Sequence, residues 1–188
     1  MDKLDDADIL LKQGKCAEAI QLLENIRKEY PNEDSVLVRL AWAFWDLGEK
    51  DRSVEHWETL LDRELQYKVF TGFAYDELVR IYKQEGQRNR LVLVCEKAVG
   101  VQPGDVGLLT ELGLAYLLAG LYEKACAVFK KLTDLEGDNP VFYLKLGEAL
   151  LAAGKQDAAC AAFDRAAQID PEEADRYYFQ AADLHTRA

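Results

Sequence analysis

The sequence predicts an all-α protein, a right-handed α-solenoid of about five stacked helical hairpins followed by a C-terminal capping helix. Three observations support this fold. The sequence repeats itself about every 34 residues, apolar residues within each repeat fall at helical spacing, and runs of β-branched residues with a period of two are absent. A single hairpin of helices cannot bury its own apolar face, so neighbouring repeats are expected to stack.

The repeat is clearest in the second half of the chain. The pair Leu112-Gly113 aligns with Leu146-Gly147 at an offset of 34 residues, and the same offset places Phe129 on Phe163. We therefore predict one domain over residues 1–188. It holds five units at about 1–33, 34–71, 72–105, 106–139 and 140–173, and a capping helix at about 172–186.

The second unit is longer than the others, because the step from the second unit to the third is 38 residues. The additional residues fall within 61–71. They either lengthen a helix by one turn or form a loop beside a binding surface. Tolerated length variation at a connection is the simpler interpretation, and a rim for a ligand is the functional one.

Glycines predict where the first helix of each unit ends, because glycine is the usual residue just beyond a helix C-terminus. They are Gly14, Gly48, Gly86, Gly120 and Gly154. Asp51, Asn89 and Asp157 follow three of these glycines and are expected to cap the second helices. Small residues such as Gly113 and Gly147 should let the paired helices approach closely.

This pattern resembles the tetratricopeptide repeat (TPR) family. The family pattern is a large residue, then Leu-Gly, Tyr, Ala, Phe and Pro over 34 residues. The fourth unit has Leu112-Gly113, Tyr116, Ala125 and Phe129 in these places, and the fifth unit ends on Pro171. The resemblance covers essentially the whole chain. It implies stacked hairpins whose first helices line a concave groove.

The resemblance also implies which side chains face this groove. The ninth and twelfth positions of the first helices, in the second to fifth units, are Trp42, Trp45, Arg80, Lys83, Leu114, Leu117, Glu148 and Leu151. Tryptophan and arginine are typical anchors at protein interfaces. We therefore expect an apolar or amphipathic segment of another protein to bind here, with an acidic group near Arg80 and Lys83. The alternative is that Trp45 and the leucines pack against neighbouring repeats or against the chain's own termini.

The leading hypothesis for function is a non-catalytic scaffold that binds a partner peptide or helix in the concave groove. Two alternatives stay open, a self-assembling module that forms homo-oligomers and a regulatory subunit of an enzyme. The sequence has no GxGxxG, P-loop, HExxH or GxSxG motif, so we expect no catalytic residue, no metal site and no cofactor. The only two histidines are His56, on a second helix away from the groove, and His185.

Charge and cysteine usage narrow the compartment and the partners. The formal net charge is −11, which disfavours nucleic acid and anionic membrane surfaces as partners. Four aspartates among the first eight residues argue against a secretory signal. The cysteines Cys16, Cys95, Cys126 and Cys160 form no CxxC pair, so we interpret them as small buried packing residues. Together these features predict a cytoplasmic protein.

Overall fold

The computed structural model describes the backbone of residues 3–187 and the side chains of residues 3–179 and of Ala182. Within this part of the chain lie eleven α-helices, one short 3-10 helix and no β-strand, which confirms the predicted all-α class. The helices are α1 (Lys3–Lys12), α2 (Cys16–Glu29), α3 (Asp34–Asp46), α4 (Lys50–Tyr67), α5 (Phe73–Gln84), α6 (Arg88–Val101), α7 (Val106–Leu118), α8 (Tyr122–Leu135), α9 (Pro140–Ala152), α10 (Gln156–Ile169), η1 (Pro171–Glu173) and α11 (Ala174–Arg187).

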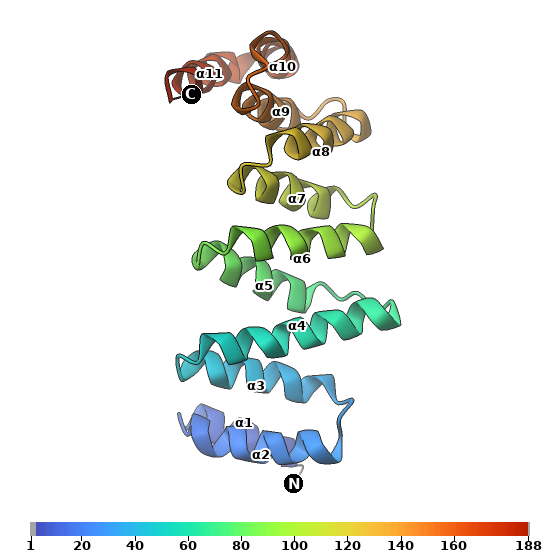
Figure 1. The fold of residues 1–188 in the computed structure, drawn as a ribbon, viewed down its shortest axis with the longest axis vertical. Helices are drawn as coiled ribbons and strands as arrows, with labels where there is room; N and C mark the ends of the chain where they lie inside the picture. Colours follow the sequence, from blue (N-terminus) through green and yellow to red (C-terminus); the bar gives the residue numbers. More distant parts are fainter. Residues whose placement is uncertain (1–2, 188) are drawn as a thin grey trace. The chain divides into compact units, whose positions relative to one another are not determined.

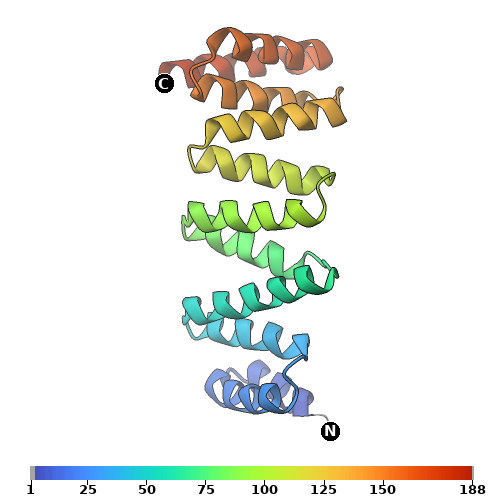
Figure 2. The same ribbon diagram turned by 45° about the vertical axis from the view of Figure 1, so that its right-hand side comes forward.

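The chain divides into two compact units, residues 1–81 and 82–188, with the boundary inside α5. In the first unit α1 packs against α2, α2 against α3, and α3 against α4 (Figure 1). In the second unit α6 to α11 pack in the same successive manner, and α11 also contacts α9 (Figures 1 and 2). Each unit is therefore built from helices that bury their apolar sides against their neighbours in sequence. The repeat limits and the single domain over 1–188 stay predictions.

The glycines predicted to end the first helices do so. All five adopt positive φ angles, between 65° and 77°. After α3, the Gly48 N–H donates to the carbonyl oxygen of Trp45 and the Glu49 N–H donates to that of Phe44, both at 2.9 Å. This pair of bonds is a Schellman motif. The motif requires a left-handed backbone conformation just after the helix, and glycine adopts this conformation without steric cost.

The predicted caps of the second helices are wrong. Helices α4, α6 and α10 begin two residues after the glycine, so Asp51, Asn89 and Asp157 lie at the second helical position rather than at the N-cap. The reason is the tight glycine turn, which leaves room for only one residue between the glycine and the next helix. Asp51 and Asp157 still lie in the first turn, where a negative charge interacts favourably with the helix dipole.

The two helices of a hairpin approach most closely at Gly113 and Gly147. A Cβ atom added to Gly113 would lie 2.7 Å from Cζ of Phe129, and one added to Gly147 would lie 2.6 Å from Cε1 of Phe163. Both phenylalanine rings are buried. The absence of a side chain at these glycines is therefore what admits each ring between its paired helices.

The second unit ends on α11, which packs against α9 and α10. Tyr177 of this helix is buried in a cluster with Leu144, Phe163 and Ala166, and its hydroxyl donates to the Asp170 carboxylate at 3.0 Å. The helix therefore covers apolar surface of α9 and α10, which is the role of a terminal capping helix in a stack of repeats.

The additional residues of the second predicted repeat lengthen a helix. Helix α4 has 18 residues, whereas α2, α6, α8 and α10 each have 14. It ends at Tyr67, and the C-cap residue Lys68 adopts a left-handed φ of 56°. Four residues are close to one helical turn, so the addition keeps the apolar face of α4 in register with its neighbours.

Replacing Gly113 with alanine tests the close approach of helices. We expect Gly113→Ala to lower the free energy of unfolding by about 1–3 kcal/mol, because the new methyl group overlaps the Phe129 ring. Urea denaturation measures this change. Gly100→Ala is the matched control, since Gly100 lies within α6 and an added Cβ there meets no atom within 4 Å. The control should be neutral or stabilising by up to about 1 kcal/mol, and an equal loss in both variants would contradict the packing explanation.

Candidate functional site

In the first unit, the predicted groove positions on α3 and α5 come together around Trp45. Trp42 and Trp45 of α3 are both half-buried, and Arg80 of α5 is exposed. The Arg80 guanidinium carbon lies 5.0 Å from the Trp45 ring centroid, and Lys50 Nζ lies 5.4 Å from it. These are cation–π distances. The indole of Trp45 is thus held beside two cations while part of its surface stays accessible.

Arg80 is also held by its own helix. Its Nε and Nη2 atoms donate to Glu77 Oε2 at 3.0 and 2.8 Å. An acidic group of a partner, as expected from the sequence, would therefore have to compete with Glu77 for this guanidinium. The same guanidinium also lies over the Trp45 ring, so it contacts both the indole and Glu77.

Trp42 packs against a buried aromatic side chain of α4. Its ring meets the buried Trp57 of α4 edge to face, with centroids 5.6 Å apart and an interplanar angle of 84°. Trp57 in turn meets Phe73 at the start of α5, with centroids 5.5 Å apart. Trp42 therefore forms a contact with the core and keeps a partly exposed face.

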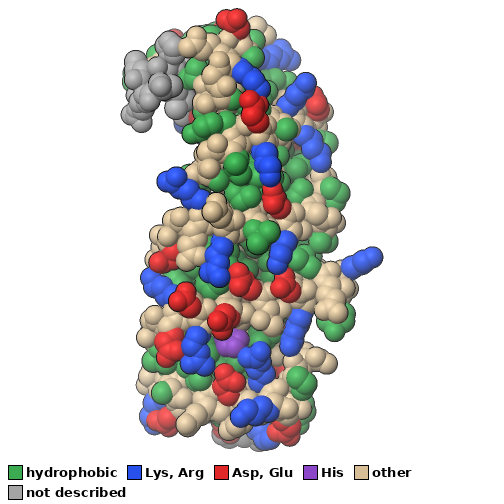
Figure 3. Space-filling view, viewed as in Figure 1, with side chains coloured by type: hydrophobic (Ala, Val, Ile, Leu, Met, Phe, Trp, Pro, Cys, Tyr) green, Lys and Arg blue, Asp and Glu red, His purple; other side chains and the backbone are tan. Residues whose placement is uncertain are grey.

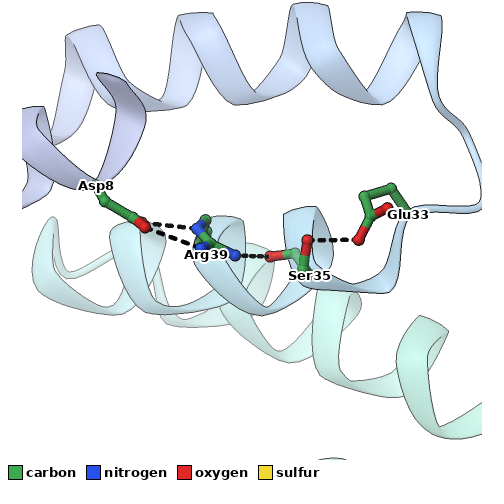
Figure 4. A network of polar contacts seen from close by, with 4 residues as sticks. All are labelled: Asp8, Glu33, Ser35 and Arg39. Atoms are coloured by element: carbon green, nitrogen blue, oxygen red, sulfur yellow. Dashed lines mark hydrogen bonds and ion pairs between the residues drawn. The ribbon is translucent and has the colours of Figure 1, made fainter. Parts of the chain in front are cut away.

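An ion pair links α1 and α3, the first helices of the first two hairpins (Figure 4). Arg39 of α3 donates from Nε and Nη2 to the two carboxylate oxygens of Asp8 on α1, at 2.7 and 2.9 Å. The Arg39 hydrogen bond holds the pKa of Asp8 below its usual value. Arg39 also donates to the Ser35 carbonyl oxygen, and the Ser35 hydroxyl donates to Glu33. This bidentate pair fixes α1 against α3.

The predicted positions of the second unit form their own arrangement. Lys83 Nζ lies 2.5 Å from Glu111 Oε2 of α7. Lys145 pairs with Glu148 within α9, at 2.8 Å. Leu114, Leu117 and Leu151 are half-buried, so each contributes both to packing and to the surface. The structure thus places apolar surface beside paired charges in this unit.

A pocket of about 410 Å³ lies in the first unit where α4 carries its additional turn. Its lining residues are Asp34, Ser35, Val38, Leu60, Arg63, Glu64, Tyr67, Val69, Thr71 and Phe73. Sequence reasoning placed length variation here but not a pocket. The signal that could have found it was the 38-residue step, because the added turn supplies Tyr67 and the loop that follows it.

Glu64 holds the loop between α4 and α5, beside the pocket, through hydrogen bonds. This buried carboxylate accepts hydrogen bonds from the Thr71 hydroxyl and, at 3.3 Å, from the Thr71 N–H. The Thr71 hydroxyl oxygen also accepts from the Phe73 N–H at 3.3 Å. Glu64 therefore connects the last turns of α4 to the start of α5 and gives the pocket a defined wall.

His56 is part of the packing of the first unit. Its ring stacks on Phe44, with centroids 5.4 Å apart and an interplanar angle of 19°. Burial lowers its pKa to about 4, with further lowering from the charges of Arg27 and Arg52. It is neutral at neutral pH and lies on α4. The side chain of His185 lies outside the described residues.

The prediction that the cysteines are buried holds for three of the four. Cys16, Cys95 and Cys126 are buried as predicted, but Cys160 is exposed, because its position on α10 faces away from the neighbouring helices. Among the described residues no His, Cys, Asp and Glu side chains gather in a group that could hold a metal ion. In the same part of the chain, no helix has the length and hydropathy needed to cross a membrane. Acidic and basic side chains are interspersed on the face in Figure 3.

Comparison with known proteins gives a family match. A family model described as tetratricopeptide repeat matches residues 4–67 and 111–174, about two thirds of the chain. The TPR repeat-containing protein YvcD of Bacillus subtilis is 30% identical over 148 residues, which are 75% of this chain and 29% of that protein. The aspartyl/asparaginyl beta-hydroxylases of mouse and human are each 26% identical over 71% and 69% of this chain, and 19% and 18% of their own lengths. The chain thus spans less than a third of these relatives.

Solved structures support the same fold. The crystal structure of MamA matches with a TM-score of 0.60 and 20% identity, covering 92% of both chains. TTC0263, a thermophilic TPR protein of Thermus thermophilus, matches with a TM-score of 0.51 and 28% identity, covering 97% of this chain and 96% of that one. At 20% identity the likeness to MamA concerns the fold alone.

Removing the Glu64 carboxylate tests the wall of the pocket. Glu64→Ala should lower the free energy of unfolding by about 1–3 kcal/mol, because Thr71 loses a charged hydrogen-bond acceptor. Amide hydrogen exchange should also accelerate over residues 69–73. Gln66→Ala is the control, since Gln66 is an exposed residue on the same helix and should change stability by less than about 0.5 kcal/mol. Unchanged exchange in Glu64→Ala would show that other contacts hold the loop.

The depressed pKa of His56 predicts a loss of stability in acid. The unfolded chain takes up a proton near pH 6.5 and the folded chain only near pH 4, so the free energy of unfolding falls as the pH decreases between these values. The full effect is about 3 kcal/mol. His56→Phe removes this titration and preserves an aromatic ring against Phe44. Urea denaturation at about pH 7 and pH 4.5 should show a smaller decrease for the variant, and parallel decreases would refute the assignment.

Proposed function

Because the chain belongs to the tetratricopeptide repeat family, we propose that it is a non-catalytic protein-interaction module. Its partner, an apolar or amphipathic peptide or helix, binds to the face formed by α3 and α5. The observation that carries this proposal is the Trp45 indole, half-buried on that face with the Arg80 guanidinium 5.0 Å from its centroid. A tryptophan and an arginine in contact on an accessible surface are a typical anchor pair for a partner protein.

The face is preformed, which lowers the cost of binding. Trp42 is braced by Trp57, and Trp45 is held beside Arg80 and Lys50, so little side-chain freedom remains to be lost when a partner covers them. Burial of the exposed parts of the two indoles supplies the favourable free energy, at roughly 25 cal/mol per Å² of apolar surface. An acidic group of the partner would orient the segment by replacing Glu77 at Arg80.

The second unit offers a separate surface of similar chemistry. Leu114, Leu117 and Leu151 supply apolar area. Two ion pairs supply charge in the same unit, Lys83 with Glu111 and Glu148 with Lys145. The formal net charge of −11 supports a protein partner rather than nucleic acid or an anionic membrane. The separate cysteines, none of them in a CxxC pair, support a cytoplasmic location.

Two other functions remain candidates. The likeness to aspartyl/asparaginyl beta-hydroxylases favours one in which these repeats serve the catalytic part of an enzyme, as a regulatory subunit or an attached domain. In either case the repeats themselves would carry out no chemistry. The other is self-assembly into homo-oligomers. Light scattering over a concentration series separates it, since a homo-oligomer has a molar mass above that of one chain and a strict monomer at high concentration would exclude self-assembly.

Substitution of Trp45 tests the proposed face. Trp45→Ala and Arg80→Gln should each reduce capture of partner proteins from a lysate, with Trp45→Ala reducing the affinity by about 30-fold or more. Capture is quantified by mass spectrometry against the wild type. Leu93→Ala is the control. Leu93 is an exposed leucine on α6, which does not belong to the face formed by α3 and α5.

Circular dichroism should show unchanged helicity in all three variants, so that loss of capture is not loss of fold. Trp42→Ala is a less suitable test, because Trp42 packs against Trp57 and its removal leaves a cavity. If Trp45→Ala and Arg80→Gln retain the same proteins as the wild type, the face formed by α3 and α5 is not the binding surface.

A further inference from the structure

We propose that the pocket beside the additional turn of α4 receives one large uncharged side chain, a leucine, phenylalanine or tryptophan, from the polypeptide that binds the face of α3 and α5. This inference rests on the proposed function and adds a specificity site to it. The pocket has a volume of about 410 Å³, within the range of roughly 300–1,000 Å³ that is usual for ligand sites.

The mouth of the pocket is apolar and exposed. Tyr67, Val69 and Phe73 border it and keep 66%, 62% and 45% of their surfaces accessible. Val38 and Leu60 continue the apolar lining inward, and Leu60 is buried. Large apolar side chains gathered around a hollow indicate a binding surface in soluble proteins. Single exposed apolar residues scattered over a surface are common and do not indicate one.

The polar groups in the wall are already engaged in hydrogen bonds or ion pairs. Arg63 Nη1 donates to Asp34 Oδ1 at 2.9 Å, and its Nη2 donates to the carbonyl oxygen of Pro31 at 2.7 Å. Glu64 is engaged by the Thr71 hydroxyl and N–H. A charged guest would lose its hydration and would have to displace one of these existing interactions, and this exchange is unfavourable. The wall therefore complements an uncharged guest.

The position of the pocket identifies a polypeptide as the source of that side chain. Val38 in the pocket and Trp42 on the proposed face are four residues apart on α3, so they lie on the same side of the helix about 6 Å apart along its axis. Phe73 in the pocket wall also contacts Trp57, which contacts Trp42. Two residues of an extended chain span about 6.6–6.8 Å. One bound segment can thus cover Trp42 and place the side chain two residues away into the pocket.

Short peptides of defined sequence test this inference. The probes are acetylated and amidated pentapeptides Gly-Ser-X-Ser-Gly, in which X is leucine, phenylalanine, tryptophan, alanine, glutamine, glutamate or lysine. Binding is followed through the amide signals of ¹⁵N-labelled full-length protein. The leucine, phenylalanine or tryptophan peptide should shift the signals of residues 60–73, with a dissociation constant on the order of 1 mM. The other four should bind at least about tenfold more weakly.

Variants at the mouth assign the shifts to the pocket. Tyr67→Ser combined with Val69→Ser should weaken the best peptide by about fivefold or more, because both side chains lie at the exposed mouth. Val69→Ser alone is the second variant in case the double variant loses its signal dispersion, and it should weaken binding in the same direction. Leu93→Ser is the control, and it should leave the affinity unchanged.

Three results would overturn the inference. They are equal binding of the glutamate or lysine peptide, unchanged affinity in the mouth variants, and binding of free indole or toluene as tight as that of the best peptide. The last would make the pocket a site for a small apolar molecule. The test is independent of the proposed function, because peptide shifts at residues 60–73 should persist in Trp45→Ala. Loss of the pocket result with intact Trp45-dependent capture, or the reverse, therefore shows which of the two proposals fails.

Discussion

The close contact between a backbone without a side chain and a buried ring is the constraint on which the hairpins of α7 with α8 and of α9 with α10 depend. At Gly113 and Gly147 the paired helices approach so closely that the rings of Phe129 and Phe163 occupy the space of a Cβ atom. This contact fixes the spacing of α8 from α7 and of α10 from α9. Because the packing uses that side of the hairpin, the opposite side of the first helix is available for other residues.

The available sides of the first helices carry charges that are paired locally. Asp8 pairs with Arg39 between α1 and α3, and Arg80 pairs with Glu77 within α5. An ion pair with an exposed arginine, such as Arg80 with Glu77, contributes only about 0–1 kcal/mol to stability. This pair is therefore weak enough to exchange with a partner. The contact of Arg80 with Trp45 adds a cation–π interaction beside this ion pair.

The additional turn of α4 shows how a repeat acquires a feature of its own without disturbing its stack. A change of about one turn returns the helix to the same face, so the buried residues of α4 stay in place while Tyr67 extends beyond them. The loop that follows is then fastened back by Glu64 and Thr71. Known relatives identify the family of this chain, and this local geometry is what distinguishes its second repeat.

The helical class, the hairpin repeat and the glycines that end the first helices could be predicted from the sequence, because spacing and positive φ are local properties of the chain. The sequence could not decide whether residues 61–71 form a helix or a loop, and it misplaced Asp51 and Asp157 as caps. The contacts of Trp45 with Arg80, and of Glu64 with Thr71, were also decided by the tertiary structure. These outcomes depend on which side chains meet between helices, and a one-dimensional pattern does not contain that information.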